Sequence, residues 1–245
     1  RRGFGLFCGG LAFRLEPNNF DFNGSGGAAI TTGGISVNDP GPNGLITLSN
    51  NTATTLITHT FDSDKDGNIN VDGDVITYTG LEPITDNLNA VKRRFLFNNS
   101  ANDIVLGNYA PMLGMSRIET TNGTSESVNF KNPTSSLLVR GRRGNDMITV
   151  NNFDASYGAS TTIRGNRGND LIVMNNTTGT GSFRLEGNLD NDEIRILNTT
   201  RTINARGNGG TDTLTSLDSN NNTWNVNQTG GGTVNTVTFR TFENV

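Results

Sequence analysis

The chain has 245 residues, a formal net charge of −4 at pH 7 and a hydrophobic fraction of only 32%. This balance provides no bulk positive charge, which excludes nucleic acid and anionic lipid as partners held by net charge. Binding by local clusters of arginine is not excluded by the net charge. No apolar run approaches the roughly 20 residues that a membrane-spanning helix needs, so no membrane insertion is expected. Abundant glycine (31 residues), asparagine and threonine predict an all-β chain of strands and turns.

Residues 1–95 predict an N-terminal part of irregular β coils with long loops. Residues 36–61 illustrate this, because apolar and polar residues alternate there between proline and glycine positions. His59 is the only histidine, which excludes a histidine cluster for zinc, and its alternating surroundings predict an exposed strand position. Residues 85–95 are the only segment typical of a helical turn or cap.

An acidic segment at residues 62–74 partly resembles an EF-hand calcium loop. Its candidate ligands fall on alternate positions: Asp62, Asp64, Asp66, Asn68 and Asn70. Gly67 matches the glycine of the EF-hand loop. Gly73, however, occupies the position of the bidentate glutamate, and the flanking segments are predicted to be strands and not helices. Two readings stay open, a partial calcium loop and a plain acidic hairpin tip.

A repeat follows in the second half of the chain. The segment VRGRRGNDMITV, residues 139–150, returns as IRGNRGNDLIVM at residues 163–174. Counting two looser copies, the turns are spaced by 24, 22 and 20 residues and begin at Gly141, Gly165, Gly187 and Gly207. Apolar residues alternate on both sides of each turn, so each copy predicts a strand, a tight polar turn and a second strand.

Two features of the repeat make specific predictions. The apolar residue two positions after each aspartate is expected to join one interior column: Ile148, Ile172, Ile194 and Leu214. Positive φ is expected at the glycines where the path turns most tightly: Gly141, Gly144, Gly165 and Gly168.

A unit of about 22 residues cannot bury its apolar face alone, but stacked on similar neighbours it forms a continuous core. We therefore predict a right-handed parallel β-helix, a solenoid with coils of about 20–24 residues, because parallel crossovers are almost always right-handed. Residues 96–245 are expected to form the regular coils, continuous with residues 1–95.

Stacked coils would bring four aspartates into one column: Asp146, Asp170, Asp192 and Asp212. Carboxylates about 4.8 Å apart would repel by about 3–4 kcal/mol at an effective dielectric constant of ~20. One compensation is calcium, because the turns resemble the glycine-rich nonapeptide of RTX (repeats-in-toxin) proteins, which implies Ca²⁺ bound between coils. The alternative is ion pairing with the arginines of the same turns: Arg142, Arg143, Arg164, Arg167, Arg184 and Arg206.

The whole chain is similar to bacterial extracellular proteins built from right-handed β-helices, such as adhesins and filamentous-haemagglutinin-like stalks. The likeness lies in the irregular coils, the Gly/Asn/Asp turns and the closing segment at residues 213–245. It implies a non-enzymatic structural or adhesive module, secreted or on the cell surface, with surface glycans or matrix proteins as partners.

The alternative function is a carbohydrate-active β-helix enzyme of the polysaccharide lyase or hydrolase type. No catalytic residues are assigned in the sequence. Trp224, the only tryptophan, could contact a sugar in either function, and a core position in a terminal coil is the other reading of this residue.

The ends of a β-helix expose unpaired strand edges, and neither end of this sequence offers a segment typical of a cap. The phrases at residues 11–17 and 237–244 are alike, as a repeating axis would require. We therefore expect end-to-end self-association into a filament, and continuation of the coils in a longer chain is the alternative.

Overall fold

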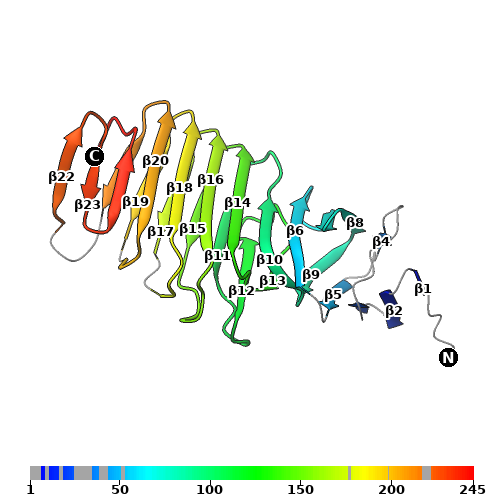
Figure 1. The fold of residues 1–245 in the computed structure, drawn as a ribbon. Coiled ribbons are helices and arrows are strands. Elements are labelled where there is room, and N and C mark those ends of the chain that lie inside the picture. The colour runs from blue at the N-terminus through cyan, green and yellow to red at the C-terminus, as the bar shows by residue number, and fades with distance from the viewer. Residues whose placement is uncertain are drawn as a thin grey trace.

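The structure is a computed structural model that describes residues 7–8, 11–16, 19–24, 35–38, 44–50, 53–175, 178–197, 199–216 and 222–245. Strands dominate this part of the chain, which contains no helix, and they form two sheets of 12 strands each with long parallel segments (Figure 1). The predicted all-β class is confirmed. A search of the same residues finds no helix that is long and apolar enough to cross a membrane.

The spatial order of the strands in each sheet differs from their order in the sequence. Sheet 1 consists, from one edge to the other, of β1 (Phe7–Cys8), β2 (Leu11–Glu16), β3 (Asn19–Gly24), β5 (Gly44–Asn50), β9 (Leu81–Asp86), β13 (Val128–Lys131), β12 (Met115–Thr120), β11 (Asp103–Asn108), β15 (Met147–Val150), β17 (Leu171–Met174), β19 (Glu193–Ile196) and β21 (Thr213–Ser216). Sheet 2 consists, in the same way, of β22 (Trp224–Gln228), β23 (Gly231–Val234), β24 (Val237–Arg240), β20 (Ile203–Gly209), β18 (Phe183–Leu189), β16 (Ser160–Arg167), β14 (Ser136–Arg143), β10 (Asn89–Leu96), β6 (Ala53–Phe61), β7 (Gly67–Val71), β8 (Asp74–Thr79) and β4 (Ile35–Asn38).

The most regular part runs from β14 to β21, where the chain alternates between the two sheets (Figure 1). The strands β14, β16, β18 and β20 are parallel neighbours in sheet 2, and β15, β17, β19 and β21 are parallel neighbours in sheet 1. The registers reproduce the spacings of the repeat, because equivalent positions are occupied by Val139, Ile163, Leu185 and Ala205. Each repeat copy therefore contributes one strand to each sheet.

The core lies between the inner faces of the two sheets. The predicted interior column is confirmed, since its members pair across parallel strands and are all buried: Ile148, Ile172, Ile194 and Leu214. Ile104 of β11 extends the column by one strand. Phe95 of β10 in sheet 2 meets Phe130 of β13 in sheet 1, with their ring centroids 4.8 Å apart. Side chains from both sheets thus share one core.

Antiparallel segments flank and interrupt the regular part. They are β6–β7–β8 and β22–β23–β24 in sheet 2, and β1–β2–β3 and β11–β12–β13 in sheet 1. The similar phrases at residues 11–17 and 237–244 do not occupy equivalent places, contrary to the prediction. The first contains β2, which is antiparallel to β3 in sheet 1, and the second contains β24, which is parallel to β20 in sheet 2.

The helical turn predicted within residues 85–95 is wrong, because this segment forms the end of β9 and most of β10. β10 is bonded on both sides, in parallel with β6 and with β14. Ala90, Arg93 and Phe95 face inward and alternate with exposed or half-buried neighbours. Two ladders of hydrogen bonds and this burial override the local helical preference.

The glycine prediction is only half correct. Gly144 and Gly168 do have positive φ. At the start of each turn, however, positive φ belongs to the residue after the glycine: Arg142 (83°), Asn166 (88°), Asn188 (90°) and Asn208 (81°). Asparagine tolerates this left-handed conformation better than most residues, which explains its frequency there. Gly141 and Gly165 must be required for another reason.

Candidate functional site

The four aspartates of the repeat form a continuous hydrogen-bonded column, which we call the Asp ladder: Asp146, Asp170, Asp192 and Asp212. The backbone N–H of Asp146 donates to Asp170 Oδ1 (2.8 Å), and the N–H of Asp170 donates to Asp192 Oδ1 (2.9 Å). The same bond, 2.9 Å long, joins Asp192 to Asp212. The predicted stacking is confirmed, and each carboxylate also links its repeat copy to the strand pair before it.

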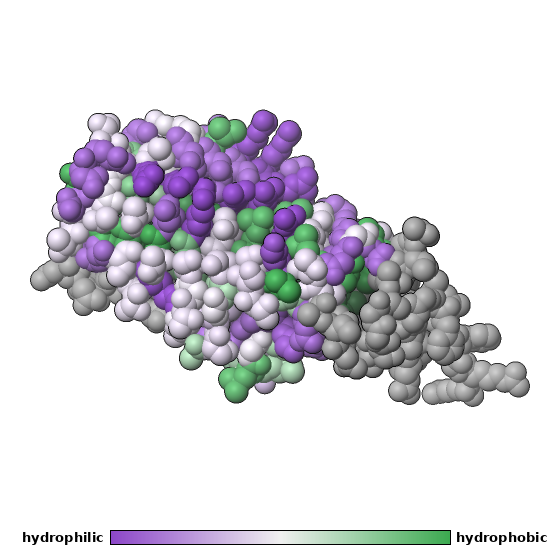
Figure 2. Space-filling model, viewed as in Figure 1, coloured by the Kyte–Doolittle hydropathy of each residue, from purple (hydrophilic) through white to green (hydrophobic). Residues whose placement is uncertain are grey.

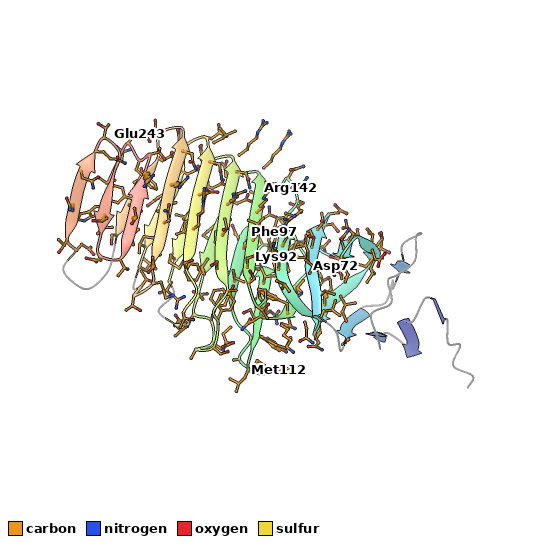
Figure 3. All side chains as sticks on the ribbon, in the orientation of Figure 1. Asp72, Lys92, Phe97, Met112, Arg142 and Glu243 are labelled. Carbon is orange, nitrogen blue, oxygen red and sulfur yellow. The ribbon has the colours of Figure 1, made fainter. Side chains whose placement is uncertain are left out.

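Two residues that were not predicted from the sequence complete the Asp ladder. At one end, the backbone N and the Nδ2 of Asn102 both donate to Asp146 Oδ1, at 2.8 and 2.9 Å. At the other end, the N–H of Asp212 donates to Glu243 Oε2 at 2.7 Å; Glu243 lies at the upper rim of the last strands (Figure 3). Residues 101–103 are similar to the turns of the repeat, and this similarity was a sequence signal that Asn102 belongs to the column. Glu243 had none, because β22 and β23 separate it from Asp212 and break the period.

The Asp ladder explains the glycine that begins each turn. The ladder aspartates are at most 3% exposed, and the Oδ2 of each is buried without a hydrogen-bond partner among the described residues. A Cβ atom on Gly165 would overlap Asp170 Oδ2, and a Cβ on Gly187 would overlap Asp192 Oδ2. The same conflict exists in the other two turns. Glycine is therefore needed for close approach of the carboxylate.

Burial raises the pKa values of the ladder carboxyls. The pKa is about 6 for Asp146, about 8 for Asp170 and about 7 for Asp192, and the pKa of Asp212 is also raised. Desolvation is the main cause in each, and the accepted backbone hydrogen bond opposes it only in part. At neutral pH Asp170 therefore stays mostly protonated, which reduces the repulsion between it and its neighbours in the ladder.

The structure shows what surrounds the ladder carboxylates and the repeat arginines. Each Oδ1 accepts a hydrogen bond from a backbone N–H, and each Oδ2 lies where a Cβ on the glycine that begins its turn would be. Calcium binding by the ladder stays a prediction. No group of three or more His, Cys, Asp or Glu in the described ranges is placed to hold a metal. Among the repeat arginines, Arg164 and Arg184 pair with Glu186 instead, because strand alternation directs them outward.

We expect the folded state to lose stability as the pH rises from about 6.5 to about 9. The folded pKa of these carboxyls lies above their unfolded pKa of about 4, so the protonated carboxyls stabilise the folded state. This contribution to the free energy of unfolding is lost as the pH rises through the folded pKa. His59 opposes this slope only below about pH 7.5, because it is neutral in the folded state while the unfolded histidine, with a pKa of about 6.5, is still partly protonated there. Urea denaturation across this range measures the slope.

The variant Asp170→Asn tests the origin of the slope. Asparagine keeps a carbonyl oxygen for the N–H of Asp146 but cannot ionise, so the slope should decrease. Asp64→Asn is the matched control, because it removes a carboxylate that is exposed at the β6–β7 loop. An equal slope in the parent protein and in Asp170→Asn would contradict the assignment.

The acidic segment at residues 62–74 forms the β6–β7 hairpin loop and the strand after it. Asn68 and Asn70 pair across the hairpin with threonines of β6, so they are strand residues. The Asp66 carboxylate accepts hydrogen bonds from Ser63 Oγ (3.0 Å) and Gly80 N (3.2 Å). The two other carboxylates of the tip are exposed: Asp62 and Asp64. The segment is an acidic hairpin tip, and calcium binding there stays a prediction.

His59 is fully buried, so its predicted exposure is wrong. Its Nε2 lies 2.9 Å from Asp86 Oδ2, and its ring stacks on Phe95 with centroids 5.1 Å apart. Arg93 pairs with the same carboxylate and donates to the carbonyl oxygen of Leu88 at 2.6 Å. Burial raises the pKa of Asp86, but Arg93 and His59 outweigh it and hold the pKa at about 2. This buried triad ties together β6, β9 and β10.

A groove on sheet 1 is another polar site of the described residues. Val105, Asn108, Arg117 and Glu119 contribute to its lining, and Arg117 Nη2 lies 2.7 Å from Glu119 Oε2. Val105 and Asn108 belong to β11, which is in register with the repeat strand β15, whereas Arg117 and Glu119 belong to the antiparallel strand β12. No pattern in the sequence indicated this groove, because Arg117 and Glu119 lie on β12, which has no counterpart in the repeat.

Trp224 lies on β22, the outermost strand of sheet 2, and the predicted core position is wrong. Its side chain is 36% exposed and its ring meets Phe239 edge-on, with centroids 5.6 Å apart. The Trp224 side chain is exposed because β22 is the edge strand of sheet 2. A sugar contact at Trp224 stays a prediction.

Comparison of the chain with protein-family models, with curated proteins and with solved structures found no match. Function therefore has to be inferred from the geometry of the described residues.

Proposed function

We propose that the chain is a non-enzymatic structural module, a right-handed parallel β-helix with coils of about 20–24 residues that associates end to end. The Asp ladder is the observation that carries this proposal. It places the most regular acidic residues of the sequence in bonds between coils, where they support stacking and have no access to a substrate.

The helical path is supported by the alternation of the chain between two parallel sheets. A chain that returns to the same sheet in parallel after each turn advances along one axis, and parallel crossovers are right-handed in nearly all known cases. Stacked units of this kind gain their stability from neighbours and form elongated modules. An extracellular or cell-surface location, with surface glycans or matrix proteins as partners, rests on the resemblance to adhesin-like stalks.

End-to-end association is supported by the outer edge of β22. All residues of β22 are exposed, and they include Trp224 and Val226, which is 56% exposed. An exposed edge strand with apolar side chains is a template for pairing with another chain. Pairing between the opposite ends of two copies is a heterologous contact, and such a contact does not close and extends into a filament.

The test is sedimentation velocity and negative-stain electron microscopy of the isolated chain at micromolar concentration. We expect end-to-end polymers, and we expect Val226→Lys to shorten them, because lysine on an edge strand disfavours pairing. Thr229→Lys is the matched control, since it adds the same charge in the exposed turn after β22. Monomers at all concentrations, or equal polymers in both variants, would overturn the assembly.

A carbohydrate-active enzyme is the second candidate, favoured by the groove on sheet 1. The groove brings an acidic and a basic side chain together outside the repeat, as a catalytic site would. Glu119 is the single carboxylate among its described lining residues, whereas most glycosidases use two. Release of reducing ends from a polysaccharide, abolished by Glu119→Gln, would favour this candidate over the structural one.

A further inference from the structure

The outer side of sheet 2 carries a concentration of positive charge, although the chain as a whole is acidic. Ten of its 19 lysines and arginines lie on the outward positions and strand ends from β10 to β24. This basic face consists of Lys92, Arg94, Arg140, Arg142, Arg143, Arg164, Arg167, Arg184, Arg206 and Arg240. Hydrophilic side chains gather over the upper part of these strands (Figure 2), and Arg142 lies near the upper end of β14 (Figure 3).

Strand register orders these charges into rows across the sheet. One row contains, in spatial order, Arg140, Arg164, Glu186, Arg206 and Arg240. Adjacent strands lie about 4.8 Å apart, so the members of a row are direct neighbours. Glu186 is the only acidic residue at the described outward positions of β10, β14, β16, β18, β20 and β24, and it pairs with Arg164 and Arg184.

Arg140 of the basic face has a hydrogen-bond donor that lacks an acceptor among the described residues. Its Nε is buried and has no hydrogen-bond partner within the described residues. Burial lowers the pKa of Arg140, and the nearby positive charges of Arg164 and Arg94 lower it further. An anion bound along the row would reduce the repulsion between the arginines.

Three features of the basic face indicate the kind of anion. Nine of its ten cations are arginines, whose planar forks bind carboxylates through two parallel hydrogen bonds. Hydroxyl and amide side chains lie in rows beside the arginines, and they suit the hydroxyl groups of sugars: Ser136, Ser160, Thr162, Asn204 and Thr238. The described outward positions from β10 to β24 hold no aromatic ring, whereas single-stranded nucleic acid is usually bound by base stacking.

We infer that the basic face binds a linear acidic polysaccharide, a chain of uronic acids lying across the strands of sheet 2. The carboxylates of successive sugars would meet the arginine row, and the hydroxyls would meet the serine, threonine and asparagine rows. This inference names a partner for the structural module, but it does not require assembly, because one copy carries the complete face.

The test is calorimetric titration of the chain with polygalacturonate at low ionic strength, with dextran as the neutral polymer. The protein concentration is kept below the onset of any polymerisation, so that binding and assembly are measured separately. We expect binding of polygalacturonate that weakens steeply with added salt, and no binding of dextran.

The variant Arg94→Gln/Arg140→Gln should weaken this binding by roughly tenfold or more, since each charged hydrogen bond contributes to affinity. Lys131→Gln/Arg195→Gln is the matched control, because it removes two positive charges from sheet 1. If the first pair alters the melting curve, Arg142→Gln/Arg143→Gln replaces it, since both side chains are exposed.

Three results would overturn the inference. The first is no binding of polygalacturonate by the folded parent protein. The second is an equal loss of affinity in the basic-face variants and in the sheet 1 control. The third is tighter binding of oligothymidylate or of a DNA duplex at the same ionic strength, which would assign the basic face to nucleic acid.

Discussion

Replacing Ile172 with aspartate is expected to unfold the regular parallel strands of the repeat. Ile172 is fully buried on β17 and pairs with Ile148 on one side and Ile194 on the other, so the new carboxylate would be buried between apolar neighbours. Burial of an unpaired charge costs more than about 4 kcal/mol, a large part of the stability of a typical domain. Urea denaturation followed by circular dichroism measures the loss.

The control for this variant is Val173→Asp, one position along the same strand. Val173 faces outward and is half-buried, so its replacement should cost much less. A parent-like denaturation curve for Ile172→Asp, or equal losses in the two variants, would mean that the assigned register of β17 is wrong.

Replacing Gly165 with alanine is expected to destabilise the fold by about 1–3 kcal/mol or more, as overpacking does elsewhere. The new methyl group would overlap the Asp170 carboxylate, which is held by its hydrogen bond to Asp146 and cannot move away freely. Gly209→Ala is the matched control, because a Cβ there would find its nearest neighbour at 3.4 Å, an ordinary contact. Chemical denaturation gives both values.

A double-mutant cycle separates this contact from a general preference for glycine. In Asp170→Ala the carboxylate is absent, so adding Gly165→Ala should cost little, and the two changes should be strongly non-additive. Additive losses would show that Gly165 is required for some reason other than the carboxylate.

The regular half of the fold could be predicted because its period is visible in the residues themselves. A fixed spacing of isoleucines after each turn defines an inward-facing position, and stacking of identical units then fixes the register of the column through Ile172. The repeated aspartate likewise predicts the Asp ladder. The surroundings of each ladder carboxylate could not be predicted from residue type. They depend on how closely the carboxylate approaches Gly165 or the equivalent glycine of its turn.

Outside the repeat, no period in the sequence indicates which side of a strand a single residue faces. His59 has an alternating neighbourhood on β6, but only its contact with Asp86, 27 residues away, shows that it faces inward. The strand at residues 89–96 is stabilised by two neighbours distant in sequence, which local propensity does not register. Trp224 looked like a core residue because of its size, and its exposure follows from the edge position of β22.

The Asp ladder also constrains how such a chain can change in length during evolution. The corner that carries it has the same length in every copy: residues 144–146, 168–170, 190–192 and 210–212. The opposite corner, which returns the chain from sheet 1 to sheet 2, shortens from residues 151–159 to residues 175–182 and then 197–202. Within this chain the copies from β14 to β21 thus differ in length at one corner only, and adding or removing a whole copy would leave the bonds between the remaining copies in place.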